Sequence, residues 1–165
     1  MAVVASVLGA VAALVCGGCA TQSGPVVAMQ SIPMGLSPVE EAVAPREAWR
    51  LAEDYALEHP GCEVLLGSGD SMLPLYHDRT VLVIEPMAMS GLKAGMTVIF
   101  TGERGWPVAH TLLEKTPRGW RTMGLGNREP DRTTVRYDNY IGTVVKAFAP
   151  TAQLALAQVA RAEED

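Results

Sequence analysis

The feature that most restricts the fold is a series of short β-rich segments between residues 62 and 148. The segments are rich in valine, isoleucine, threonine and aromatic residues, and glycine or proline lies between neighbouring segments. Such a pattern is typical of strands joined by tight turns. We predict six strands, with the sequences CEVLL, TVLVIEP, TVIFTG, PVAHTLLEK, GWRTMG and YIGTVVKAF. The chain is therefore expected to be mainly β, with one β domain over residues 62–149.

Two segments that flank this domain have helical patterns. Residues 45–60 begin with proline, a residue suited to the first turn of a helix, and end where Pro60 and Gly61 would stop it. The apolar residues of one predicted helical face are Ala48, Leu51, Ala52 and Tyr55. Residues 150–165 show a second helical pattern, so we expect a helix at each end of the β domain.

The N-terminus has the composition of an export signal or a membrane anchor. Residues 2–18 contain no charged side chain and are almost all small or apolar. Their number fits the apolar region of a signal peptide or a short anchor. We therefore assign residues 1–19 to one of these two. Residues 20–44 are rich in Pro, Gly and small residues, as flexible linkers are.

Cys19 follows Gly17 and Gly18 and precedes Ala20 and Thr21. This arrangement resembles the lipobox of bacterial lipoproteins. The resemblance implies that lipid is attached to Cys19 and that the mature protein is exported and bound to a membrane through its N-terminus.

Length and charge narrow the remaining possibilities. A chain of 165 residues has room for one sizeable core. Its formal net charge of −5 provides no basic surface for a nucleic acid, so no nucleic-acid partner is expected. Cys16 and Cys19 have CxxC spacing but belong to the N-terminal segment assigned to the signal or anchor, and the three cysteines form no metal-spaced cluster with histidine. We expect no metal and no cofactor, and we interpret Cys62 as a small buried apolar residue.

The most unusual stretch for chemistry is GSGDSMLPLY at residues 67–76, which contains Ser71. A serine hydroxyl is a poor nucleophile unless a base lies within hydrogen-bond reach. His59 ends a predicted helix, and His77 lies in a turn-like stretch where a solvated histidine is expected. His110 lies in the middle of the apolar strand PVAHTLL, where its ring needs a partner to offset desolvation.

Several stretches resemble, in the same order, the conserved boxes of a known enzyme family. GDSMLP resembles the catalytic serine box of the type I signal peptidases and the LexA-like self-cleaving peptidases. PVAHTLL is similar to the base-bearing strand of the archaeal and endoplasmic-reticulum signal peptidases, which use histidine. The other matching stretches are LKAGMTVIF at residues 92–100, TMGLGNREPD at 122–131 and the closing strand DNYIGTVV.

This resemblance implies a coiled antiparallel β-sheet peptidase domain in which Ser71 is the nucleophile and His110 the general base. The chemistry of imidazole favours the same base, because it can accept the hydroxyl proton near neutral pH and return it to a leaving amine. Lys115 is the rival base. On a regular strand it would point to the face opposite His110, since five residues separate them. Lys93 and Lys146 are expected to be solvated.

The remaining site residues are expected on similar grounds. Asp131 could fix the tautomer of His110 as the third member of a catalytic triad, or it could be a turn residue after Pro130. Gly69 would let the chain bend beside the substrate, and the N–H of Ser71 would stabilise the oxyanion. Met72 would form part of an apolar floor, or simply be a core residue.

Three functions follow from these expectations. The first is a membrane-tethered serine endopeptidase of signal-peptidase type, which cleaves exported peptides after small residues outside the cytoplasm. The second is a catalytically inactive peptide-binding or structural module of the same fold, suggested by Met96 and Thr111, where the family usually has Asp and Arg. The third is a LexA-like self-cleaving regulator, which would need an upstream DNA-binding motif, whereas residues 20–60 supply one clear helix.

Overall fold

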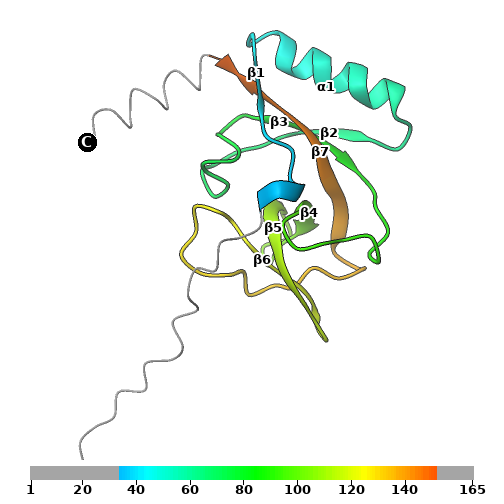
Figure 1. The fold of residues 1–165 in the computed structure, drawn as a ribbon, viewed down its shortest axis with the longest axis vertical. Helices are drawn as coiled ribbons and strands as arrows, with labels where there is room; N and C mark the ends of the chain where they lie inside the picture. The colour runs from blue at the N-terminus through cyan, green and yellow to red at the C-terminus, as the bar shows by residue number, and fades with distance from the viewer. Residues whose placement is uncertain (1–33, 152–165) are drawn as a thin grey trace, which may run out of the picture. The chain divides into compact units, whose positions relative to one another are not determined.

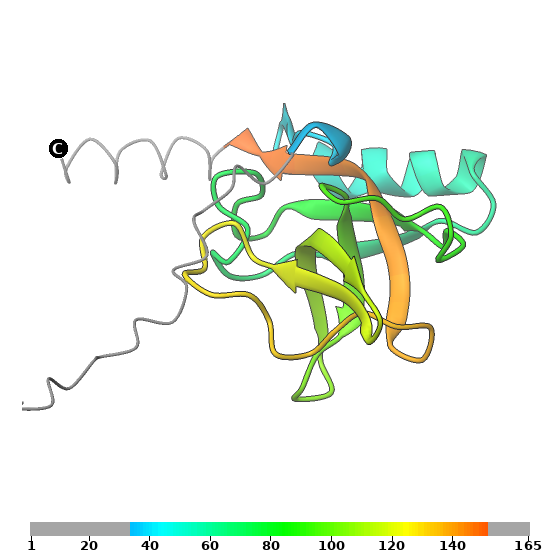
Figure 2. The ribbon, with the colours of Figure 1, turned by 60° about the horizontal axis from the view of Figure 1, so that its bottom comes forward.

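The computed structural model describes residues 34–151, which form a seven-stranded, mainly antiparallel sheet with one α-helix (Figures 1 and 2). The mainly-β prediction is confirmed. Along the chain the elements are η1 (Met34–Leu36), β1 (Glu41–Val43), α1 (Glu47–Glu58), β2 (Glu63–Leu66), β3 (Val81–Glu85), β4 (Thr97–Thr101), β5 (Pro107–Thr116), β6 (Gly119–Met123) and β7 (Tyr140–Pro150). All six strands predicted from the sequence are present.

The sheet is built around β7, the long curved strand in Figure 2. The spatial order is β2-β3-β7-β4-β5-β6. One edge of β7 pairs with β3, and the other pairs with β4 and, in parallel, with β1. Register shifts interrupt the pairing of β3 and of β4 with β7. Such irregularities increase the local twist of a sheet, which allows β7 to serve both halves of the domain.

The helix α1 forms where the sequence predicts one and packs its small apolar face on the sheet. Ala48 and Ala52 are fully buried in a cluster with residues of β3 and β7. On the exposed face, Arg50 pairs with Asp54 at 2.7 Å, an i,i+4 ion pair that favours the helix. The helix ends before Gly61, whose positive φ of 97° reverses the chain into β2.

Two apolar clusters lie on opposite faces of the β4–β5 pair. Ile99 and Ala109 point into the first, which also contains Met72, Leu75, Tyr76, Leu82, Ile84, Val144 and Ala147. Val98, Phe100 and Leu112 belong to the second, together with Leu92, Trp120 and Val135. His110 pairs with Val98 across the two strands, so its side chain lies on the face of the second cluster.

The linker predicted over residues 20–44 is wrong for its last part. Residues 34–43 contain η1 and β1, and this segment is held to the domain by buried polar contacts. The Ser37 hydroxyl donates to the carbonyl of Gly95 at 2.7 Å, and the Tyr76 hydroxyl donates to the carbonyl of Pro38 at 2.8 Å. The sequence did not reveal this because β1 has only three residues and is mostly exposed, so it has no alternating pattern.

Several expectations concern residues that the structure does not describe. The signal or anchor at residues 1–19, lipid attachment at Cys19, the linker over residues 20–33 and the helix predicted for residues 150–165, apart from its first two residues, lie outside the described range. Within residues 34–151, no helix is both long enough and apolar enough to span a membrane.

Candidate active site

Ser71 lies in the loop between β2 and β3, where two local features fix its position. Before it, Gly69 has a positive φ of 88°, and its N–H donates to the carboxylate of Asp78 at 2.9 Å. After it, the chain turns, and the N–H of Tyr76 donates to the carbonyl of Met72 at 3.1 Å. Because Met72 and Tyr76 are buried in the core, the loop is anchored directly behind the serine.

His110 comes from the middle of β5 and is almost fully buried, with 5% of its surface exposed. Its ring lies 6.4 Å from the ring of Phe100, in a mostly apolar environment. A buried imidazole is costly unless both of its nitrogens find partners. His110 has a partner at each of its two ring nitrogens.

The ring of His110 joins Ser71 to Asp131. Its Nε2 lies 3.1 Å from the Ser71 Oγ, and its Nδ1 lies 2.6 Å from the Asp131 Oδ2. A carboxylate oxygen can only accept, so Nδ1 carries the proton and donates to Asp131. In the neutral ring, Nε2 is then the acceptor for the Ser71 hydroxyl. This is the arrangement that lets a histidine act as a base toward a serine.

Asp131 is held in place by a residue that the sequence did not suggest. The Thr122 hydroxyl in β6 donates to the Asp131 Oδ2 at 2.7 Å, and the Asp131 N–H donates to the Thr122 carbonyl at 2.8 Å. The sequence left open whether Asp131 orients His110 or is a turn residue. In the structure its carboxylate contacts His110. Residues 124–130, between the end of β6 and Asp131, form an irregular loop, so no periodicity could have paired Thr122 with Asp131.

The loop after β6 approaches the serine closely. The Gly126 N–H donates to the Ser71 carbonyl at 2.9 Å. A Cβ atom at Gly124 would lie 2.5 Å from the Ser71 carbonyl oxygen and 2.8 Å from the His110 Nε2, so the backbone approach requires glycine there. Asn127 donates its N–H to the Gly124 carbonyl at 3.0 Å, as a turn residue does.

The N–H of Ser71 has no hydrogen-bond partner among residues 34–151, whereas the N–H of Gly69 is already used by Asp78. The N–H of Ser71 is therefore available to donate to an oxyanion. The N–H of Gly69 is not, and the positive φ of Gly69 instead bends the chain before the serine.

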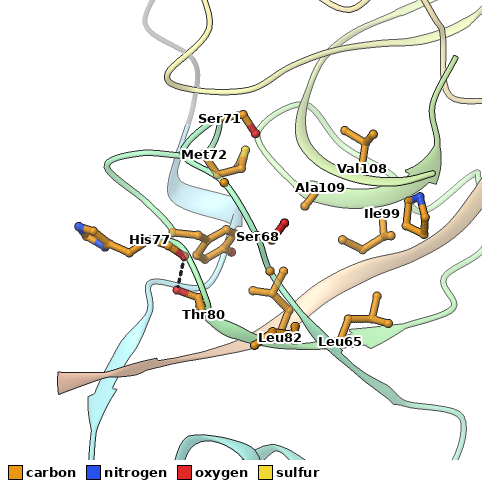
Figure 3. A pocket seen from close by; sticks show the side chains of 15 residues that line it. Leu65, Ser68, Ser71, Met72, His77, Thr80, Leu82, Ile99, Val108 and Ala109 are labelled. Atoms are coloured by element: carbon orange, nitrogen blue, oxygen red, sulfur yellow. Dashed lines mark hydrogen bonds between the residues drawn. The ribbon is translucent and has the colours of Figure 1, made fainter. Parts of the chain in front are cut away.

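An open cavity of about 250 Å³ adjoins Ser71 (Figure 3). Met72 lines this cavity and is also a buried residue of the core. The other apolar side chains in the wall include Leu65, Leu82, Ile99 and Ala109. Two strand edges border it. β2 is the last strand of the sheet, and the first half of β5 pairs with β4 on one side only. Among the strands of residues 34–151, none pairs with either of these two edges, so an added strand could pair there.

The other two histidines are structural. His59 caps the C-terminus of α1 and stacks on Tyr55 with the ring centroids 3.9 Å apart. The prediction that His77 is solvated is wrong, because its side chain is only 14% exposed and its Nδ1 pairs with Glu40. Glu40 lies in the segment assigned to the linker, so this pair could not be predicted from the sequence. His77 contributes to the wall of the cavity beside Ser71, but in Figure 3 its ring points away from Ser71.

No lysine is hydrogen-bonded to Ser71 within residues 34–151, but Lys115 lies on a different face of β5 from the one predicted. A register shift between Leu112 and Glu114 pairs Lys115 with Trp120, so Lys115 lies on the same face as His110 and not on the opposite one. It is nevertheless exposed, and five strand residues place it about 16 Å along β5 from the imidazole. Lys93 and Lys146 are exposed, as predicted.

The residues that the structure describes contain one cysteine thiol, that of Cys62, and no candidate metal site. Cys62 packs partly against the α1 cluster, and partial burial, with a smaller contribution from the Glu85 carboxylate, raises the pKa of its thiol. It is therefore a weaker nucleophile than an ordinary cysteine. No group of three or more His, Cys, Asp or Glu side chains within residues 34–151 is arranged to hold a metal ion.

Comparison of the sequence with protein-family models and with curated proteins gives no match.

Proposed function

We propose that this protein is a serine endopeptidase of the signal-peptidase type, with Ser71 as nucleophile, His110 as general base and Asp131 as the residue that orients the base. One observation supports this above all others. The His110 ring makes both contacts of a triad, 3.1 Å to the Ser71 hydroxyl and 2.6 Å to Asp131, beside an open cavity.

The chemistry follows from the contacts of each atom. His110 Nε2 takes the hydroxyl proton as the Ser71 Oγ attacks the peptide carbonyl, and the oxyanion that forms accepts a hydrogen bond from the Ser71 N–H. Asp131 stabilises the imidazolium. The C–N bond then breaks, and the imidazolium gives its proton to the leaving amine, which leaves an ester on Ser71. Water attacks this ester with His110 again as base, and the acid product and free hydroxyl are released.

The substrate is an extended peptide segment. The free edges of β2 and of the first half of β5 flank the cavity, so a peptide can add as a strand and satisfy its backbone groups there. The residue whose carbonyl is attacked places its side chain in the cavity beside Met72. The apolar wall favours small, uncharged side chains before the scissile bond.

The sequence boxes give independent support for the signal-peptidase type. GDSMLP contains the proposed nucleophile, PVAHTLL the proposed base, and TMGLGNREPD both Thr122 and Asp131. Three stretches that resemble one family by sequence therefore meet in one site. An uncharged N-terminal stretch at residues 2–18 supports export and attachment to a membrane, with lipid at Cys19.

The proposal is tested by incubating the full-length protein, in mild detergent, with a peptide that contains a signal-peptide cleavage site. We expect hydrolysis of one bond after a small residue, identified from the product masses. Tight binding without any hydrolysis would instead favour an inactive peptide-binding module.

Gly124→Ala should reduce turnover about a hundredfold, because the new methyl group forces Ser71 and His110 apart and small misplacements of reacting groups have effects of that size. The measurement is kcat on the same peptide. Gly35→Ala is the matched control, since a Cβ at Gly35 meets no atom within 4 Å. An unchanged kcat in Gly124→Ala would contradict the geometry of the site.

Thr122→Val should lower kcat about tenfold, since it removes a hydrogen bond to a charged group without changing the shape of the side chain. Thr111→Val is the control. The Thr111 hydroxyl is buried without a hydrogen-bond partner in the described residues, so its removal should keep kcat and raise the free energy of unfolding by about 1 kcal/mol. Equal kcat losses in the two variants would show that Thr122 does not act through Asp131.

A further inference from the structure

A second cavity, of about 380 Å³, borders His110 and Asp131. Its wall combines the turn between β4 and β5 with the chain that follows Asp131. The residues that line it include Phe100, Glu103, Arg104, Trp106, Val108 and Arg132. Trp106 is 72% exposed, which is unusual for so large an apolar side chain.

The two cavities lie on opposite faces of the same free strand edge. Ala109 pairs with Ile99 and lines the cavity beside Ser71, whereas the next residue, His110, pairs with Val98 on the other face and lines the second cavity. Val108 lies on the same face as His110 and contributes to the walls of both cavities. Figure 3 shows the side chains of Val108 and Ala109 pointing to opposite sides of β5. Successive side chains of a strand added along this edge must alternate between the two faces in the same way.

The charges of the second cavity favour an anionic side chain. Arg104 and Arg132 have no carboxylate partner among residues 34–151, and both guanidinium groups are exposed. Of the two carboxylates in the wall, Asp131 is already engaged by His110 and Thr122. Glu103 is the second carboxylate, and its single negative charge can offset the charge of only one of the two arginines. Guanidinium groups bind carboxylates well, and Phe100 and Val108 offer an apolar wall to the methylenes of a longer acid.

We infer that the second cavity is a specificity site for the second residue before the scissile bond, and that it prefers glutamate there. This inference rests on the proposed function, since it assumes that the first residue before the bond enters the cavity beside Ser71. The second residue then points to the other face, toward Arg104, Arg132 and Trp106. The net charge of −5 would repel an acidic substrate, so a preference for glutamate must come from this local site.

The test uses two peptides that differ only at that residue, glutamate or glutamine, with alanine on both sides of it. On the full-length protein we expect kcat/KM to favour glutamate by roughly fivefold, the scale of exposed charge pairs. Arg104→Gln and Arg132→Gln should each lower this ratio, their combination should bring it to about one, and Glu103→Gln should raise it. Each ratio compares two substrates on one enzyme, so differences in folded fraction cancel.

Arg118→Gln is the matched control, because this exposed arginine lies in the turn between β5 and β6, outside the cavity. It changes the net charge equally and should leave the ratio as in the wild type. A wild-type ratio of one or below, or an equal effect of Arg118→Gln and Arg132→Gln, would overturn the inference.

A binding measurement separates failure of this inference from failure of the proposed function. Affinity of the Ser71→Ala protein for the two labelled peptides, measured by fluorescence anisotropy, requires no hydrolysis. Tighter binding of the glutamate peptide supports the site even if no peptide is cleaved. Equal affinities, or no binding of either peptide, would overturn it.

Discussion

Ser71→Ala should reduce peptide hydrolysis by a factor on the order of 10⁴ or more, because it removes the atom that bonds to the substrate carbonyl. The Ser71 side chain is not a core element, so the variant should unfold at nearly the wild-type temperature. Hydrolysis is followed by mass spectrometry of the products, with the full-length protein in mild detergent. The loss should appear in kcat, since the cavity that binds the peptide is unchanged.

Ser68→Ala is the matched control for this variant. Ser68 lies in the same loop and lines the same cavity, but it makes no hydrogen bond to His110 in the described structure. It should retain kcat within about tenfold of the wild type, as expected for a residue that does not react. If Ser71→Ala hydrolysed the peptide as fast as Ser68→Ala, Ser71 would not be the nucleophile.

His110→Gln should lower kcat by about 10³-fold or more, because glutamine cannot take the hydroxyl proton. The same change at His77 provides the comparison. Both histidines are largely buried and pair with a carboxylate, His110 with Asp131 and His77 with Glu40. His77→Gln should lower the unfolding temperature by weakening the attachment of residues 37–43, but kcat should stay within about tenfold of wild type.

The comparison is read from two measurements on each variant, kcat and the midpoint of thermal unfolding. A large loss of kcat in His110→Gln without the same loss in His77→Gln identifies His110 as the base. Similar losses of kcat in both variants, in proportion to their losses of stability, would mean that His110 is only a structural histidine.

The strands and the two main residues of the candidate site were predictable because each leaves a local signal. The six β-rich segments have turn residues between them, and Ser71 and His110 lie in short stretches that resemble known boxes. A histidine in an apolar strand also indicates a buried hydrogen-bond partner, because burying its ring without one is costly.

What the sequence did not reveal depends on pairing between distant segments. β1 has no alternating pattern of its own and is defined by its parallel pairing with the end of β7. The pair of His77 with Glu40 depends on that same segment. The orientation of Lys115 was predicted wrongly because a register shift in β5 reverses the alternation, and no residue of β5 marks the shift in advance. Thr122 reaches Asp131 only after the loop between them has folded.

The most direct test of the account is to find the covalent intermediate. An activated ester of a short peptide acylates a serine enzyme faster than water releases it, so acyl-enzyme accumulates after rapid mixing and acid quench. Mass spectrometry of the digested protein should then locate the acyl group on the fragment that contains Ser71. The group should be absent from Ser71→Ala and strongly reduced in His110→Gln. Hydrolysis of the peptide with no acyl group on Ser71, or with the acyl group on another residue, would contradict the account.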